Sequence, residues 1–240
     1  GLYGNMFGYS DVTDSSDAAM EQPVVWITNN KDRSPAELVW VPQQAWGSLG
    51  GSLLNLSYGT GRVFVVPHEN LDGDWQGAVC ELPMPACETG LMRGRFGRDG
   101  SLYGCGMFAW AGNATSPGGF ERIRRNAAPA YLPLKIQAKV GVLEVRMSDE
   151  LEGVTLRAED FQMKAWSLRR SANYGSKHFD ERPWRVSGAT LSADKKSLIL
   201  EIPDLALTQS YELVIKFTSA KGEIIERNLH GTIHHLTKGK

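Results

Sequence analysis

Two arginines separated by one residue are the side chains with the clearest potential for ligand chemistry. Arg93 and Arg95 lie in the stretch LMRGRFGRDGSLYGCGMFAW, residues 91–110. Residues i and i+2 of a β-strand point to the same face, so the pair would place two guanidinium groups side by side. Guanidinium groups remain charged and bind carboxylates through parallel hydrogen bonds. The spacing therefore predicts a clamp for an anionic ligand.

Two other segments have part of the pattern of a metal site. NLDGDW places Asn70, Asp72 and Asp74 at alternating positions, as in calcium loops, but no bidentate glutamate follows at the expected distance. His230 and His234 could share one face of a strand, yet the remaining ligands of a four-coordinate site are missing. A solvated turn and an ordinary terminal strand are the favoured interpretations, and no metal ligand is predicted.

The seven tryptophans allow two interpretations. An exposed indole can stack on the apolar C–H face of a sugar ring, whereas a buried indole packs sheets together. Packing is favoured for most of them, with Trp26, Trp46 and Trp75 as further candidates for a sugar contact at loop edges. Trp110, which opens the long loop AWAGNATSPGG, is the predicted substrate-binding residue.

Composition excludes several classes of function. The net charge of −1 gives no reason to expect nucleic acid, and no apolar run is long enough to span a membrane. Three cysteines, Cys80, Cys87 and Cys105, lack the spacing of a zinc site or a haem attachment. Cys80 and Cys87 flank a proline-rich turn and could pair in an oxidising compartment, or all three could be small buried side chains.

The elements that must position these residues are predicted to be strands. Short β-branched or aromatic runs alternate with Gly, Pro, Asn and Asp, and the first half sustains no helical period. The chain is therefore predicted to be all-β. The predicted strands cover residues 24–28, 37–41, 52–58, 62–66, 78–82, 134–138, 142–147, 162–167, 185–191, 197–202, 211–217 and 223–230.

The strands divide into two predicted domains. Residues 132–236 carry about seven strands in roughly a hundred residues, the pattern of an immunoglobulin-like β-sandwich. Residues 1–128 have four-strand clusters like the blades of a β-propeller, but about two blades cannot close a ring. They are interpreted as the C-terminal blades of a propeller whose missing blades belong to a longer polypeptide.

Several stretches resemble a known family. LVWVPQQAWGSLGGSLLNLSYGTGRVFVV, DGDWQGAVCELPM and the stretch around Arg93 and Arg95 resemble the last blades of the soluble glucose/sorbosone dehydrogenase type, found in large secreted bacterial multidomain proteins. AWSLRRSANYGSKHF and GATLSADKKSLILEIPDL are similar to the β-sandwich that follows such propellers.

The resemblance implies a function and its partners. Arg93 and Arg95 would hold the carboxylates of pyrroloquinoline quinone (PQQ), the substrate would be a sugar or polyol, and the parent protein could hold Ca²⁺. A cytochrome c or other haem-binding domain would be a partner, and the protein would be secreted or periplasmic. The lysine that the family uses on an earlier blade is replaced by Gly50 or Gly51. The family's catalytic histidine lies in blades outside this chain, so no catalytic residue is assigned and the fragment alone is not expected to be active.

Two hypotheses therefore remain. In the first, the chain is the C-terminal fragment of a quinoprotein-like sugar or polyol dehydrogenase with an accessory β-sandwich. In the alternative, it is a non-catalytic carbohydrate-binding or scaffolding module that binds a sugar or polysaccharide.

Overall fold

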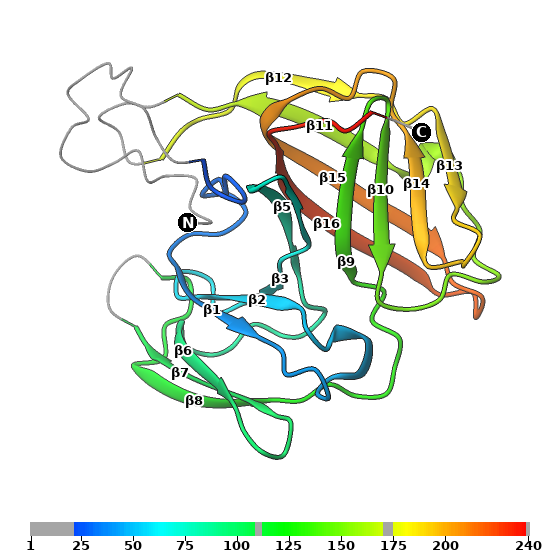
Figure 1. Ribbon diagram of the computed structural model, residues 1–240. Helices are drawn as coiled ribbons and strands as arrows, with labels where there is room; N and C mark the ends of the chain where they lie inside the picture. The colour runs from blue at the N-terminus through cyan, green and yellow to red at the C-terminus, as the bar shows by residue number, and fades with distance from the viewer. Residues whose placement is uncertain (1–21, 109–111, 170–174, 239–240) are drawn as a thin grey trace.

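The protein is all-β, as predicted. The computed structural model describes residues 22–108, 112–169 and 175–238 (Figure 1). In this part of the chain the only helical turns are the short 3-10 segments η2 (Gly47–Leu49) and η3 (Ala158–Asp160). The described residues contain no helix with the length and apolar character needed to cross a membrane. The strands form three antiparallel sheets, and none of these sheets is closed.

The largest sheet runs through almost the whole length of the chain. In spatial order its strands are β1 (Pro35–Trp40), β2 (Leu53–Ser57), β3 (Val63–Val65), β5 (Asp74–Glu81), β16 (Ile224–Ile233), β15 (Thr208–Thr218), β11 (Gln162–Ser167) and β12 (Phe179–Trp184), with β4 (His68–Leu71) paired to β5. The pairing of β5 with β16 joins Cys80 to Leu229 and Val79 to His230. The sheet is thus continuous across the domain boundary predicted at residues 128–132.

Two smaller sheets pack on this large one. The first, β13 (Gly188–Leu191), β14 (Ser197–Glu201), β10 (Val142–Met147) and β9 (Pro133–Lys139), lies over β15 and β16 (Figure 1). Its inward side chains Leu143 and Leu198 share one core cluster with Leu213 and Ile215 of β15. Two antiparallel layers therefore enclose an apolar core in the second half of the chain.

The third sheet is β6 (Leu91–Phe96), β7 (Leu102–Met107) and β8 (Gly118–Ile123), at the lower left of Figure 1. It rests on β1 and β2 through buried Leu91 and Leu102. Gly94 allows this close approach, because a Cβ there would lie 2.6 Å from Cδ1 of Leu56. Asp99 and Gly100 form the turn between β6 and β7.

The segment before β1 crosses the outer face of the large sheet. We call residues 22–28 the strap. A strand was predicted at residues 24–28, and this prediction is wrong, because the strap is extended but pairs with no strand. Side chains of β15 and β16 hold it instead: Thr232 Oγ1 accepts from the Trp26 amide at 2.8 Å, and Ser210 Oγ donates to the Trp26 carbonyl at 3.1 Å.

Apolar packing also holds the strap. Val25 and Ile27 are buried and pack on Phe64, Val66 and Val79, which face away from the main core. The strap therefore covers an apolar patch that the large sheet would otherwise expose to water.

Most predicted strands are confirmed, two of them to the residue: β10 and β11. The prediction missed β4, β8 and β12 and placed a strand at residues 185–191, of which only Gly188–Leu191 (β13) is one. The sequence of β12, FDERPW, contains three charges and Pro183, which is typical of an edge strand that avoids further pairing.

Candidate functional site

Arg93 and Arg95 lie on one exposed face of β6, as their spacing predicts. They stand opposite Cys105 and Tyr103 of β7. The Arg95 guanidinium forms an ion pair with Glu37 of β1, with 2.5 Å between Nη1 and Oε1. The second oxygen of Glu37 accepts the Gly94 amide at 2.7 Å.

The Glu37 carboxylate is therefore anchored between two donors of β6. Desolvation acts to raise the pKa of Glu37, but the hydrogen bonds from Arg95 and Gly94 outweigh it and hold this pKa below its usual value. Glu37 therefore already occupies part of the Arg95 guanidinium that a ligand carboxylate would bind.

The arginine pair faces open solvent. The Arg95 side chain is 75% exposed, and Arg93 donates to the carbonyl of Met92. Neither arginine lines any of the cavities described below. An anionic ligand would have to displace Glu37 from Arg95, and binding of a quinone by Arg93 and Arg95 stays a prediction.

Trp110, the predicted sugar contact, lies outside the described residues. The three further candidates differ in exposure. Trp26 is buried within the strap, Trp46 is partly buried, and Trp75 is 47% exposed. Only Trp75 of these three presents much of its ring to solvent.

An exposed cluster of rings forms around Trp75. His68, at the start of β4, lies 5.5 Å from Trp75 of β5 and 5.9 Å from Trp40 at the end of β1, measured between ring centroids. Trp40 is 59% exposed. We call Trp40, His68 and Trp75 the aromatic surface. Sequence reasoning missed Trp40, although its alternation with Leu38 places both on one face of an edge strand.

A glycine makes this cluster possible. Gly77 of β5 pairs with His68, and a Cβ at Gly77 would lie 3.1 Å from Cβ of His68 and 2.9 Å from Cγ1 of Val24. Both distances are shorter than normal carbon contacts. The imidazole can therefore sit over β5 only because residue 77 has no side chain.

A hydrogen bond fixes the tautomer of His68. Its Nδ1 lies 2.7 Å from the Val66 carbonyl oxygen. Because a carbonyl only accepts, Nδ1 of a neutral imidazole carries the proton and Nε2 is left as an acceptor. The aromatic surface thus includes a hydrogen-bond acceptor between its two indoles.

The segment NLDGDW, considered above for calcium, is the turn of the β4–β5 hairpin. Asp72 and Gly73 both have positive φ, and the Gly73 amide donates to Asn70 Oδ1 at 3.0 Å. This confirms the turn interpretation. Asp74, beside this turn, pairs with His235 at 3.1 Å. In the described ranges no group of three or more His, Cys, Asp or Glu could hold a metal ion.

The C-terminal histidines clamp the strap. His230 Nε2 lies 3.0 Å from the Trp26 carbonyl oxygen, and His234 Nε2 lies 2.9 Å from the Pro23 carbonyl oxygen. Burial lowers the pKa of His230 to about 3. A neutral His230 is therefore part of the packing and has no access to a substrate.

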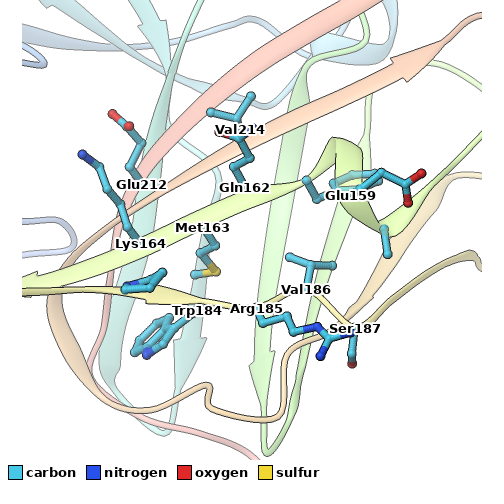
Figure 2. Close-up of a pocket in the computed structure, with 13 residues that line it drawn as sticks. Glu159, Gln162, Met163, Lys164, Trp184, Arg185, Val186, Ser187, Glu212 and Val214 are labelled. Atoms are coloured by element: carbon cyan, nitrogen blue, oxygen red, sulfur yellow. The ribbon is translucent and has the colours of Figure 1, made fainter.

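A cavity of about 680 Å³ opens where the chain leaves β12 (Figure 2). Lys164 of β11 and Glu212 of β15 are paired across the sheet and project in the same direction, while Met163 points the other way. Lys164 Nζ lies 3.5 Å from Glu181. The lining combines both charge signs with apolar side chains but offers no nucleophile beside a base, so it supports binding better than catalysis.

A buried acid, Asp32, lies in the loop after the strap and was not singled out from the sequence. Asp32 is 1% exposed, and burial raises its pKa to about 6 against the hydrogen bonds from Ser57, Thr60 and Asn55. Ser57 Oγ donates to it at 2.5 Å. These bonds tie the loop after the strap to β2, and the enclosed carboxylate is structural.

Comparison with known proteins gives no family. No family model, no curated protein and no solved structure matches the chain.

Proposed function

We propose that the chain is a non-catalytic carbohydrate-binding module whose aromatic surface holds a neutral polysaccharide. The observation that carries this proposal is the pair of solvent-exposed indoles, Trp40 and Trp75, on either side of His68. Large aromatic side chains are usually buried, and a cluster left in water at neighbouring positions is typical of a binding surface.

The chemistry of the surface suits a sugar ring. An indole offers a flat apolar face to the C–H groups of a pyranose. Stacking removes both surfaces from water, which stabilises the complex by about 25 cal/mol per Å² of apolar area buried. Nε2 of His68 can accept a bond from a sugar hydroxyl, and Asn70, which follows on the same strand and pairs with Trp75, can donate one. Apolar stacking with a few polar groups that fix orientation is the general pattern of small-ligand sites.

The charge near the surface favours a neutral glycan. Asp72 lies at the tip of the same β4–β5 hairpin that carries His68 and Trp75, and it would repel a carboxylate-bearing sugar. We therefore propose a neutral polysaccharide such as a glucan or a xylan as the ligand class.

The rest of the fold acts as a scaffold in this proposal. The layers at residues 132–236 are interpreted as an immunoglobulin-like sandwich, and the sheets at residues 1–128 as terminal propeller blades of a longer secreted or periplasmic protein. Because β5 pairs with β16, a glycan bound at the aromatic surface would be held at a fixed position relative to the rest of such a protein.

Affinity electrophoresis in gels containing soluble glucans or xylans tests the proposal. The wild type should be retarded by at least one of them, and Trp40→Ala and Trp75→Ala should each reduce this retardation, with the double variant losing it. Phe120→Ala is the matched control, because Phe120 is a 72% exposed aromatic on β8. Migration of the wild type unaffected by every neutral glycan, or an equal effect in the control, would reject the proposal. Binding to proline-rich peptides and to no glycan would also reject the proposal.

A second candidate function is the quinoprotein-like dehydrogenase fragment. The observation that favours it is the shared exposed face of Arg93 and Arg95, which could receive two carboxylates of PQQ. In this proposal the parent chain supplies the other blades, the base that takes the alcohol proton, any Ca²⁺, and a cytochrome c or haem-binding domain.

Binding of PQQ by the chain tests this second candidate. Arg93→Ala with Arg95→Ala should weaken binding by roughly 1.5–3 kcal/mol for each charge-assisted hydrogen bond that the substitutions remove. Glu37→Gln should strengthen it, because the competing carboxylate is removed. The same affinity for wild type, double variant and Glu37→Gln would exclude a role for this clamp.

A further inference from the structure

Two adjacent cavities lie where the β6–β8 sheet meets the loop before η2. One of about 270 Å³ is lined largely by apolar side chains, among them Leu49, Leu82, Met84 and Leu132. The other, of about 440 Å³, is bounded by the turn at Asp99–Ser101. The two share a wall formed by Trp46, Arg124, Arg125 and Asn126. We call the two cavities and this wall the arginine groove.

The guanidinium of Arg125 is incompletely satisfied. Its Nε is buried and has no hydrogen-bond partner among the described residues. Its nearest carboxylate is that of Asp149, with 3.8 Å between Nη2 and Oδ1. The other oxygen of Asp149 already accepts from the amides of Ala130 and Tyr131. The Arg125 guanidinium therefore lines both cavities without a close carboxylate partner, so a ligand anion at this wall would add the missing charge-assisted contact.

Arg124 adds a second positive charge to the same wall. Its side chain is exposed and makes no ion pair with the described residues. The carboxylate of Asp99, which borders the groove, already accepts hydrogen bonds from Ser101, Tyr103 and Arg122. The groove therefore has a net positive wall beside an apolar cavity.

Trp46 is held in a strained conformation at this wall. It is a bulky residue with φ 57° and ψ 22°, in the left-handed region that disfavours such side chains. Its Nε1 donates to the Gly100 carbonyl at 2.9 Å, and its ring meets Phe96 edge to face at 5.1 Å. Local strain of this kind persists where surrounding contacts enforce it and is concentrated at ligand sites.

We propose that the arginine groove binds a small aromatic carboxylate. Its ring would fill the apolar cavity beside Trp46 and Met84, and its carboxylate would bond to Arg124 and Arg125. The ring accounts for the apolar lining, and the carboxylate accounts for the two guanidinium groups at the wall. This site is separate from the aromatic surface, and the inference does not depend on glycan binding.

Calorimetric titration of the full chain with three probes tests both halves of the inference. The probes are 4-hydroxycinnamate, its neutral counterpart 4-hydroxycinnamyl alcohol, and acetate, which has the charge without the ring. The groove should bind 4-hydroxycinnamate at least tenfold more tightly than either of the others, and the affinity should fall as salt is added.

Variants locate the binding. Arg124→Ala should weaken 4-hydroxycinnamate binding by roughly tenfold or more, the effect expected when a charge-assisted hydrogen bond is removed. Met84→Glu should abolish it by placing a like charge in the apolar cavity, and thermal unfolding of each variant shows that the fold is retained. Arg157→Ala, an exposed arginine before η3 outside the groove, should bind like the wild type.

Three results would overturn the inference. The first is a wild type that binds no 4-hydroxycinnamate. The second is equal affinity for the neutral alcohol, which would remove the role of the arginines. The third is unchanged affinity in both Arg124→Ala and Met84→Glu, which would place the ligand elsewhere. Glycan binding through Trp40 and Trp75 is unaffected by any of these results.

Discussion

The imidazole of His230 and the carbonyl of Trp26 are joined by a hydrogen bond of 3.0 Å across 204 positions of the chain. Nε2 donates to this carbonyl, the shorter of its two contacts, since the Thr28 amide lies 3.3 Å from the same nitrogen, and complete burial lowers the pKa of His230 to about 3. The folded protein thus keeps His230 neutral, whereas the unfolded chain protonates it near its ordinary value of about 6.5.

This difference predicts an acid-sensitive stability. Between pH 6.5 and about 3 the unfolded state binds the extra proton, so the free energy of unfolding falls as pH falls, by up to about 1.4 kcal/mol per pH unit. Urea unfolding of His230→Gln should show a shallower pH dependence than the wild type in this window. His235→Gln, which removes an exposed histidine paired with Asp74, is the comparison and should change the slope less than His230→Gln does. Parallel curves for wild type and His230→Gln would contradict the prediction.

Asp32 should act in the opposite sense. Burial raises the pKa of Asp32 to about 6, so between pH 3.8 and 6 the folded state binds more protons and stability rises as pH falls. Asp32→Asn should therefore stabilise the protein by about 1–2 kcal/mol at pH 8 and by less at pH 4. The new amide can donate to Asn55 Oδ1, which has no partner among the described residues, after rotation of the Asn55 amide.

The control for Asp32 is an acid with the reverse shift. Hydrogen bonds from Ser192 and Arg146 lower the pKa of Asp194 to about 2, so Asp194→Asn should lower stability at neutral pH. A decrease of stability in Asp32→Asn at pH 8 would show that the hydrogen bonds of the ionised carboxylate outweigh its desolvation.

Gly77→Ala should disturb the aromatic surface without changing any of its rings. The added methyl group would meet Cβ of His68 at 3.1 Å and displace the imidazole from between the indoles. We expect several-fold weaker retardation by the glycan that binds the wild type, with a stability cost of about 1–3 kcal/mol for overpacking. Gly118→Ala is the matched control, because a Cβ there has only one ordinary contact, at 3.6 Å. Unchanged glycan affinity in a folded Gly77→Ala variant would argue against a role for His68.

The three cysteines should differ sharply in reactivity. All three are free; Cys80 and Cys87 are buried and Cys105 is exposed on β7. Burial raises the pKa of both Cys80 and Cys87 to about 11, which suppresses the reactive thiolate. Titration of the native protein with a thiol reagent should therefore give one fast thiol, absent in Cys105→Ser, and three after unfolding. Two fast thiols in the native state would show that one buried cysteine is accessible.

Local patterns were sufficient to predict most strands. The alternation in Val142–Met147 and Gln162–Ser167 agrees with their ends to the residue, because one face of each is more deeply buried than the other, with buried Trp166 the exception on the outer face of Gln162–Ser167. The strap was mistaken for a strand because its apolar residues are typical of one. Its hydrogen bonds go to side chains of β15 and β16, far along the sequence, and no local pattern reports them.

The candidate sites were harder to predict. The same-face placement of Arg93 and Arg95 followed from the period of a strand, but the pairing of Arg95 with Glu37 joins positions 58 residues apart. Trp40 and Trp75 are exposed because nothing covers that face of β1 and β5 among the described residues, and a sequence does not show which face is covered. The arginine groove likewise depends on the packing of the β6–β8 sheet against the loop before η2.

The pairing of β5 with β16 has a consequence for biosynthesis. When β5 leaves the ribosome, the strand that completes its edge has still to be translated, about 150 residues later, and at 5–20 residues per second the delay is on the order of ten seconds. During that interval Val79 and Cys80 lie on a strand with one unpaired edge, the kind of edge through which nascent chains associate. The edge of β5 is therefore protected from association with other chains only after the C-terminal strand is made. Chaperone demand should be greatest before Ile224–Ile233 emerges.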